Sequence, residues 1–372
     1  MTATEQIIVL NPGSTSTKIA VFDGLTKRFS VNIDHPAAEL EAFADIVDQL
    51  PFRRQAIIEA LKEASVDLDA TAAFAAICTG LPAMPGGVYE VEEQMAEAAR
   101  VGAGSRHPGR LGPLLAYDFA KLCHVKGFVV DPSSVDEFCD EARLTGFRGL
   151  LRISRGHPLN QRAVALRYAA ENGLNYEEIN LVVAHMGGGI SVSAHQHGKM
   201  IDTVDSTCGE GRMAPTRTGM LPAARVVDLC FSGEYSKKDL LDRIQKCGGW
   251  TDLLGTADAR EVLRRIDAGD EWARLVFNTT AYQIAKDIGS CAATMSGDVQ
   301  AILLTGGLCY AQPFVEKITS MVKFIAPVHV YPGEFEMEAL AQGALSVLQG
   351  KVKARIYTGE PVFKGFPESK AN

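Results

Sequence analysis

The chain has 372 residues, of which 47% are hydrophobic and 22% charged, and its formal net charge is −8. This length exceeds one ordinary core and predicts two domains, and the composition is typical of a globular enzyme. The acidic balance argues against binding to nucleic acid or to an anionic membrane surface. No apolar run approaches the roughly 18–20 residues that span a bilayer, and no signal peptide is evident, so we expect a cytoplasmic protein.

Eight cysteines are spread along the chain, and none form a CxxC pair or a Cys/His cluster with zinc-type spacing. Free thiols in a reducing cytoplasm are therefore the expected state.

The first strong signal in chain order is a β-hairpin near the N-terminus. The apolar strand Ile7–Leu10 leads into the small polar residues Asn11–Thr17, and an alternating strand returns over Lys18–Asp23.

The same pattern recurs about half a chain length later. Here Leu181–Ala184 is the first strand, His185–Gly189 the turn and Ile190–Ala194 the returning strand. A repeat of this size predicts duplicated domains rather than a solenoid.

Around the hairpins, short apolar strands alternate with segments of helical spacing, which predicts an α/β fold. We expect one domain over residues 1–157, a second over 158–330, and a tail, 331–372, that returns to the first, because one face of its helix is apolar. The expected helices are Ala37–Leu50, Arg53–Ser65, Pro113–Leu122, Gln161–Asn172, Ala223–Phe231, Lys237–Cys247, Ala259–Ala268, Glu271–Ser296 and Met337–Leu348, and the other expected strands are Phe74–Cys78, Phe128–Val130 and Ala301–Thr305.

Both hairpin turns are suited to anions. Small residues allow close approach to the backbone, whose N–H groups could donate to phosphate oxygens together with Ser14, Ser16 and Lys18. The plainer interpretation is an ordinary turn, although three successive glycines, Gly187–Gly189, exceed what a hairpin needs. No GxxxxGK[ST] motif occurs, and no GxGxxG follows a strand. Two glycine-rich hairpins with a nucleotide between them are instead the plan of the acetate-and-sugar kinase, heat-shock chaperone and actin superfamily.

Six motifs make that resemblance specific. IVLNPGSTSTKIAVFD (8–23), AHMGGGISVSA (184–194), PTRTGMLP (215–222), GTADAREV (255–262), LLTGGLCY (303–310) and VYPGEFEMEALAQGAL (330–345) resemble segments of acetate and butyrate kinases. Their order and spacing follow the butyrate kinase branch over essentially the whole chain. The resemblance implies two actin-like (ribonuclease H-like) domains with a nucleotide cleft between them, a homodimer or higher homo-oligomer, and ATP- and Mg²⁺-dependent phosphorylation of a short-chain carboxylate.

The same resemblance implies roles for individual residues. The catalytic candidates are Asp131, which matches an active-site aspartate, and His157 and Arg217, which match two residues that stabilise the transition state. Nucleotide or phosphate binding is implied for Asn11, Ser14, Ser16, Lys18, His185, Gly187, Gly188, Gly189, Asp258, Arg260, Gly306, Gly307 and Leu308, and Mg²⁺ for Glu334 and Asn11, with Glu336 as the alternative to Glu334.

Each catalytic candidate also has a plainer interpretation. Asp131 follows a buried strand, where α/β folds place ligand groups, but an Asx turn has the same sequence. Arg217 lies in a segment of poor helix propensity, and loop arginines are usually solvated. His157 lies between glycine and proline on irregular backbone, where a histidine is more often at the surface than catalytic.

Other histidines are less specific. His107, also before a proline, is a further candidate near the acyl site. His195 and His197 alternate on a strand, which allows a metal pair, but no third ligand is evident and we expect a solvated strand end.

One departure concerns the acid substrate. Members of the family carry an arginine before a proline-glycine turn, and an ungapped match places Ile77 there. Arg106, Arg152 and Arg155 are the candidates to replace its charge, and Arg155 is favoured because it is two residues from His157.

Three classes of function remain open at this point. The first is the acid kinase. The second is a nucleotide-driven chaperone or filament subunit. This sequence lacks the long extra substrate domain and the polymer insertions of such proteins, and the butyrate kinase motifs speak against it. The third is an inactive relative that senses nucleotide or acyl phosphate, which the missing arginine keeps open.

Overall fold

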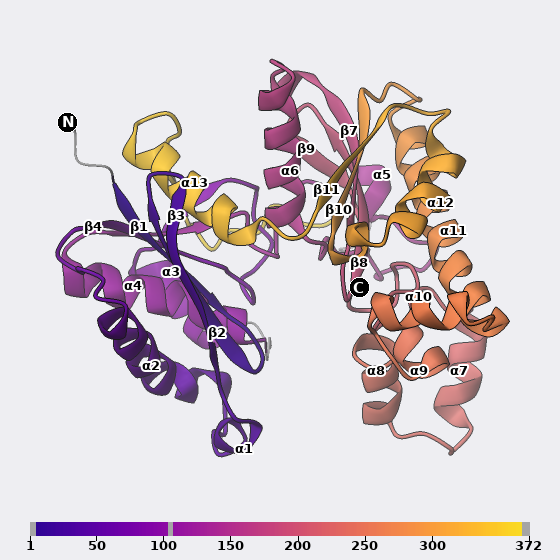
Figure 1. Ribbon diagram of the computed structural model, residues 1–372, viewed down its shortest axis with the longest axis horizontal. Coiled ribbons are helices and arrows are strands. Elements are labelled where there is room, and N and C mark those ends of the chain that lie inside the picture. Colours follow the sequence, from indigo (N-terminus) through magenta and orange to yellow (C-terminus); the bar gives the residue numbers. More distant parts are fainter. Residues whose placement is uncertain (1–4, 103–106, 367–372) are drawn as a thin grey trace. The chain divides into compact units, whose positions relative to one another are not determined.

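The computed structural model describes residues 5–102 and 107–366 (Figure 1). Contacts divide the described chain into two compact units. Unit 1 contains residues up to 136 together with 335–366, and unit 2 contains residues 137–334. The domain boundary expected between residues 157 and 158 stays a prediction. Among the described residues, no helix is long and apolar enough to cross a membrane.

Seven strands form one sheet in the described part of unit 1, in the order β12-β5-β6-β4-β1-β2-β3. Its strands are β1 (Gln6–Pro12), β2 (Ser16–Asp23), β3 (Thr26–Asp34), β4 (Thr71–Ala76), β5 (Val88–Glu90), β6 (Lys126–Val130) and β12 (Arg355–Ile356). Its helices are α1 (Ala37–Leu40), α2 (Leu50–Glu63), α3 (Glu93–Val101), α4 (Leu111–Cys123) and α13 (Glu336–Leu348), with 3₁₀ turns η1 (Ile46–Gln49) and η3 (Pro108–Arg110).

Five strands form the sheet in the described part of unit 2, in the order β11-β10-β7-β8-β9. They are β7 (Asn180–Met186), β8 (Ile190–Gln196), β9 (Lys199–Asp202), β10 (Ala301–Gly306) and β11 (Val328–Pro332). The helices are α5 (Asp140–Arg143), α6 (Pro158–Glu171), α7 (Ala223–Phe231), α8 (Lys237–Gln245), α9 (Trp250–Leu254), α10 (Ala259–Asp267), α11 (Glu271–Thr294) and α12 (Gln312–Val322), with 3₁₀ turns η4 (Tyr176–Glu178) and η5 (Gly307–Tyr310).

The two sheets repeat one topology. In unit 1 an antiparallel hairpin, β1–β2, is followed by antiparallel β3, while β4 and β6 add in parallel on the other side of β1. In unit 2 the hairpin β7–β8 is followed by antiparallel β9, and β10 and β11 add in parallel on the other side of β7. The predicted α/β fold and the predicted duplication are confirmed.

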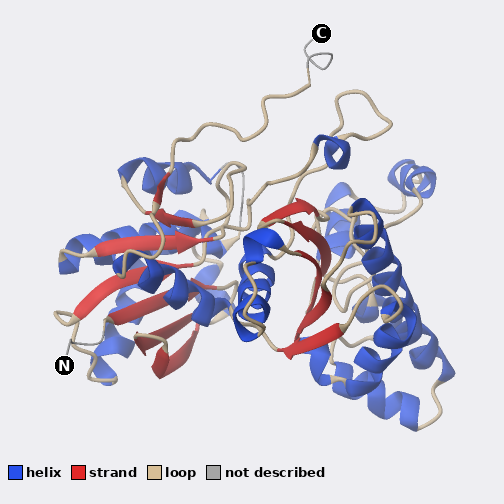
Figure 2. Cartoon of the chain, turned by 90° about the horizontal axis from the view of Figure 1, so that it is seen from above, coloured by secondary structure: helices blue, strands red, loops and turns tan. Residues whose placement is uncertain are grey.

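Alternation along the second hairpin determines what its two faces bury. Ile190, Val192 and Ala194 of β8 belong to the hydrophobic core that α11 completes. The polar residues between them, Ser191 and Ser193 among them, therefore lie on the opposite face, where α6 packs (Figure 1). Figure 2 shows helices on both sides of these strands.

Most expected helices and strands are present, with ends that match or differ by at most three residues. The continuous helix expected over Ala37–Leu50 is wrong. The helix stops after α1, because Asp45 starts a new 3₁₀ turn in which its side chain accepts the Val47 N–H, and the Asp48 carboxylate accepts the Asp45 N–H.

Candidate functional site

The turn of the second hairpin leaves open space beside its backbone. A Cβ built on Gly188 would meet only Thr216 Oγ1, at 3.8 Å, and one built on Gly307 would meet nothing within 4 Å. Gly306, in contrast, has φ +98°, and a Cβ there would lie 2.4 Å from the Met186 carbonyl oxygen. Glycine is therefore required at 306 by the protein itself, whereas Gly188 and Gly307 leave room for something else.

Two histidines stack beside this turn. His185 is the next-to-last residue of β7, and His157 is the residue before α6. Their ring centroids lie 4.0 Å apart at an interplanar angle of 15°. Burial, with the nearby Arg217 charge, lowers the pKa of His185 to about 4. Burial, His185 and Arg217 together hold the pKa of His157 well below its usual value. Both imidazoles are therefore neutral at pH 7 and act as hydrogen-bonding groups rather than as cations.

Arg217 reaches over the hairpin from the following loop. Thr216 joins this loop to the turn, because its N–H and its hydroxyl both donate to the Gly188 carbonyl, at 3.2 and 2.8 Å. A Cβ on Gly189 would lie 1.8 Å from Arg217 Nη1, so the guanidinium occupies the space that a side chain would fill. Arg217 Nη1 donates to Ser206 Oγ at 3.2 Å, while its buried Nε has no hydrogen-bond partner among the described residues. A buried unsatisfied donor on a cation is suited to an anion.

Glu334 also lies beside the Gly187–Gly189 turn, in unit 2 with His185 and Arg217. A Cβ on Gly187 would lie 3.1 Å from His185 Nε2 and 3.6 Å from Glu334 Oε1, which places both polar atoms around one glycine. Glu334 is exposed.

The structure does not gather the other predicted nucleotide residues with this group. The Leu308 side chain is buried in the hydrophobic core. Asp258 begins α10, accepts the Arg260 N–H at 2.9 Å, and pairs with the Arg260 guanidinium. The Arg260 hydrogen bond lowers the pKa of Asp258 to about 2.

In unit 1, a buried arginine supports the first turn from behind. Arg53 of α2 is 0% exposed and donates to Ser16 O at 2.8 Å, Thr17 Oγ1 at 3.0 Å, Ser14 O at 3.3 Å and Gln49 Oε1 at 3.1 Å. All four acceptors are neutral. Burial lowers the pKa of Arg53 to about 10, so it stays charged at pH 7. On the outer side, Ser14 and Lys18 are exposed, and Ser16 is half-buried.

Asn11 lies opposite Lys18 in the hairpin register and donates to Glu336 Oε2 at 3.1 Å. Within unit 1 the structure thus joins Asn11 to Glu336, the alternative metal-side residue, whereas Glu334 lies beside Gly187 in unit 2.

Asp131 has an unusual backbone at the end of β6. Its φ of +39° is in the left-handed region, which is uncommon for a residue with a side chain. Asp131 and Gly87 hold each other, because Asp131 Oδ1 accepts the Gly87 N–H at 2.7 Å and the Gly87 carbonyl accepts the Asp131 N–H at 2.9 Å. Arg355 of β12 lies against the same glycine, since a Cβ on Gly87 would be 2.9 Å from Arg355 Nε.

Among the arginines considered for the acid substrate, Arg152 is already engaged. It pairs with Asp202 at 2.9 Å and with Glu210, and it donates to the Ala142 and Thr203 carbonyls. The Arg155 side chain is 54% exposed and lies 3.5 Å from Asp205. Arg106 lies outside the described residues. His107 is exposed and its Nδ1 accepts the Gly109 N–H.

The expectation of a solvated strand end at His195 is wrong. His195 is 0% exposed, because the face of β8 that carries it lies under α6. His197 lies beyond β8 in a turn with φ +47° and is exposed, so the two histidines do not share a strand face.

Comparison with known proteins establishes the family. The acetokinase family model matches residues 157–334. A probable butyrate kinase of Clostridium botulinum is 41% identical over 352 residues, which is 95% of this chain and 99% of that protein. Butyrate kinase 2 of Clostridium acetobutylicum is 42% identical with the same coverage. The chain belongs to the acetokinase family.

Solved acetokinase structures have the same fold. Porphyromonas gingivalis acetate kinase matches 92% of this chain and 100% of its own with a TM-score of 0.78 at 19% identity. A Francisella tularensis propionate kinase matches 91% of this chain and 98% of its own with a TM-score of 0.74 at 17% identity.

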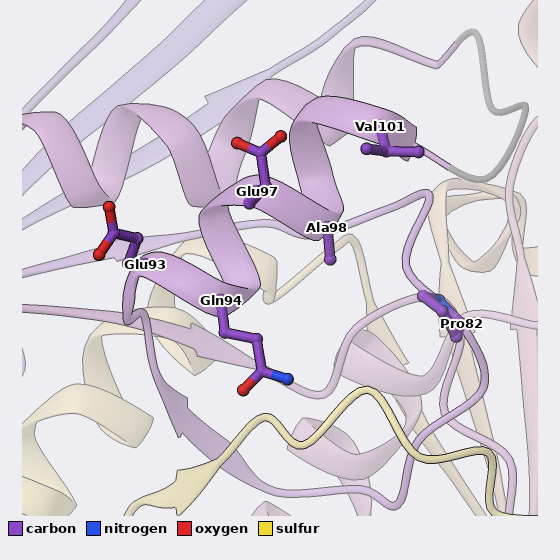
Figure 3. Close-up of a pocket in the computed structure, with 6 residues that line it drawn as sticks. All are labelled: Pro82, Glu93, Gln94, Glu97, Ala98 and Val101. Carbon is purple, nitrogen blue, oxygen red and sulfur yellow. The ribbon is translucent and has the colours of Figure 1, made fainter.

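Two arginines beside the candidate residues of this acetokinase, Arg53 and Arg355, were missed in the sequence. Arg53 shares the i, i+4 spacing of the buried residues Ile57 and Leu61, which was the available signal. Arg355 lies in a two-residue strand that has no periodic pattern. The pocket in Figure 3, lined by Pro82 and residues of α3, contains none of the candidate residues.

Proposed function

We propose that this acetokinase transfers a phosphoryl group reversibly between ATP and a short-chain carboxylate, butyrate or a branched-chain acid, by direct in-line transfer. The observation that carries the proposal is the anion-binding group of unit 2. Open glycines, two neutral histidines and the unsatisfied Nε of Arg217 surround one hairpin turn. The family resemblance supports a cytoplasmic homodimer or higher homo-oligomer.

A carboxylate is already ionised at neutral pH and needs no general base to attack phosphorus. The protein must instead align two anions and reduce their repulsion. Arg217 supplies positive charge to the transferring group, and His157 supplies an uncharged hydrogen-bond donor. Asp131 then positions metal or water and does not abstract a proton.

The nucleotide phosphates are assigned to Gly187–Gly189 with His185, and the adenosine side to Gly306 and Gly307. Mg²⁺ would neutralise charge on the phosphates and would keep several waters, so one or two carboxylates suffice. Glu334, exposed beside Gly187, fits that requirement in unit 2. Asn11 and Glu336, which are hydrogen-bonded to each other, are the metal-side candidates of unit 1. The described residues contain no cluster of three or more His, Cys, Asp or Glu side chains that could hold a metal alone.

Replacing Gly188 with valine is expected to weaken ATP binding at least about tenfold and to leave the fold intact. The protein itself has room for the new side chain, so a loss would come from a ligand that needs the space. Titration calorimetry with ATP measures the affinity. Gly289→Val in α11, where a Cβ meets nothing within 4 Å, is the matched control. Unchanged ATP affinity in Gly188→Val would remove the hairpin from the nucleotide site.

The assay that tests the function uses ATP, Mg²⁺ and a panel of acids from acetate to butyrate and branched acids. Activity is expected to rise along this series, because each buried methylene adds roughly 0.8 kcal/mol and no arginine stands at position 77.

Arg155→Ala and Arg355→Ala test which cation replaces the missing one. Loss of a cation that contacts the carboxylate raises KM for the acid and leaves KM for ATP nearly unchanged. Robust activity on acetate in the wild type and in both variants would disprove the idea that another arginine replaces the missing charge at position 77. ATP binding with no activity on any acid would instead favour an inactive relative that senses nucleotide or acyl phosphate.

A further inference from the structure

A buried chain of hydrogen bonds runs beneath α6 and ends at His157. Tyr176 Oη contacts His195 Nδ1 at 2.8 Å, and His195 Nε2 contacts Gln161 Oε1 at 3.0 Å. Gln161 Nε2 contacts Ser191 Oγ at 2.8 Å and Ser191 O at 3.1 Å. Ser191 Oγ contacts His157 Nδ1 at 2.7 Å. Gln161 and His195 are both 0% exposed.

The Ser191 carbonyl fixes the direction of this chain. A carbonyl only accepts, so the Gln161 atom that faces it must be the amide nitrogen, and Oε1 must face His195. An amide oxygen also only accepts, so His195 Nε2 carries a proton. Burial lowers the pKa of His195 to about 3, so the ring is neutral, its Nδ1 is an acceptor, and the Tyr176 hydroxyl donates to it.

The direction of donation from Gln161 also determines how Ser191 and His157 are hydrogen-bonded. Ser191 Oγ accepts one proton from Gln161 Nε2, and its own proton has one acceptor among the described residues, His157 Nδ1. A neutral His157 that accepts at Nδ1 carries its proton at Nε2.

A separate set of hydrogen bonds, from Asn160 and Thr305, fixes the tautomer of His185. The Thr305 hydroxyl donates to Gly333 O at 3.2 Å and therefore accepts from Asn160 Nδ2. The same nitrogen donates to His185 Nδ1 at 2.8 Å, which leaves the proton of a neutral His185 at Nε2. The two stacked rings thus both present Nε2–H donors, and neither Nε2 has a hydrogen-bond partner in the described chain.

We propose that Tyr176, His195, Gln161 and Ser191 are positioning residues that hold His157 in its Nε2–H tautomer, ready to donate to the transferring phosphoryl group. Donation to a phosphoryl group rests on the proposed function, whereas the Nε2–H tautomer of His157 does not. Because the donor is fixed before the substrate arrives, it needs no reorganisation during transfer.

The first measurement is the tautomer of His157 in the wild-type protein, from nitrogen-15 NMR of its imidazole. The Nε2–H form is expected for His157 and for His185, whether or not any acid is phosphorylated. A His157 proton at Nδ1 would overturn the proposal.

Gln161→Met removes the link without touching His157. It is expected to give a mixture of His157 tautomers and to lower kcat by about 10–100-fold, which is the range for loss of the hydrogen-bond partner that orients a metal-bound histidine. KM for ATP should stay within about twofold. His197→Asn, an exposed histidine in the neighbouring turn, is the control and should change neither readout.

Tyr176→Phe removes only the terminal hydroxyl and serves if Gln161→Met does not fold. It should shift the tautomer and kcat in the same direction by a smaller amount. Combination of Tyr176→Phe with Ser191→Ala should lower kcat no further than Ser191→Ala alone, because the chain acts through Ser191. Additive losses, or an unchanged tautomer in every variant, would assign these residues to stability alone.

Discussion

Replacing Arg217 with alanine is expected to lower kcat by about 10²–10⁴-fold while changing KM for ATP far less. That pattern marks a group that acts mainly in the transition state, where it stabilises the negative charge on the oxygens of the transferring phosphoryl group. The guanidinium is held over the hairpin by the loop that Thr216 ties to Gly188, and its Nε has no hydrogen-bond partner in the part of the chain that the structure describes. Steady-state kinetics with varied ATP and butyrate separates the two constants. A change confined to KM would reassign Arg217 to ground-state binding.

Gly189→Ala provides an independent test of the same geometry. The added methyl would lie 1.8 Å from Arg217 Nη1 and must displace the guanidinium. The kcat of Gly189→Ala should also fall. The double variant Gly189→Ala/Arg217→Ala should be no slower than Arg217→Ala alone, because the methyl group acts by displacing the Arg217 guanidinium. Arg225→Ala, which removes a largely exposed arginine of α7, is the matched control.

Arg53→Met is expected to destabilise the protein by about 3–5 kcal/mol and to weaken ATP-dependent activity. Removal of the guanidinium breaks its hydrogen bonds to Ser16 O, Thr17 Oγ1 and Gln49 Oε1, although Ser16 O keeps the Gly13 N–H and Thr17 Oγ1 keeps His35. A hydrogen bond to a charged group contributes roughly 1.5–3 kcal/mol, and the lower end of that range over these three bonds gives the expected loss. Arg53→Lys should recover only part, because an ammonium lacks the planar fork that reaches several acceptors. Urea denaturation gives the free energy of unfolding.

The neighbouring Arg54→Met is the control for this prediction. Arg54 lies on the same helix and packs over the Phe119 ring, and within residues 5–102 and 107–366 its Nε has no hydrogen-bond partner. The same substitution there should cost less than about 1 kcal/mol. Equal losses at both positions would show that Arg53 acts through packing and not through its contacts with the turn.

The sequence was sufficient for the hairpins and the duplication, because strand alternation and turn composition are local properties. It was not sufficient for His195, since alternation assigns a residue to a face but does not show what covers that face. The covering helix, α6, begins at Pro158, three residues before the predicted start, and this places Asn160 and Gln161 on the polar side of β7 and β8. Hydrogen bonds between residues 25 to 34 positions apart leave no periodic signal.

The uncertainty between Glu334 and Glu336 had a similar cause. Glu334 lies in the short connection between β11 and α13, and Glu336 is the first residue of α13, so an alignment gap here moves the match by two residues. The structure gives the two different neighbours, Gly187 for Glu334 and Asn11 for Glu336. Local sequence could not separate these positions, because the chain passes from unit 2 to unit 1 between them.

Arg53 gives the two copies of the hairpin different electrostatic potentials. Behind the first turn lies a fully buried cation whose contacts are all to neutral oxygens. The floor of the second is uncharged, built from Asn160, Thr305 and neutral histidines, and its cation, Arg217, comes from a half-buried loop. Buried charge is screened by salt much less than charge near solvent. The positive potential behind the first turn is therefore expected to weaken less with ionic strength than the potential beside the second, so the two copies of one hairpin shape should differ in their response to salt.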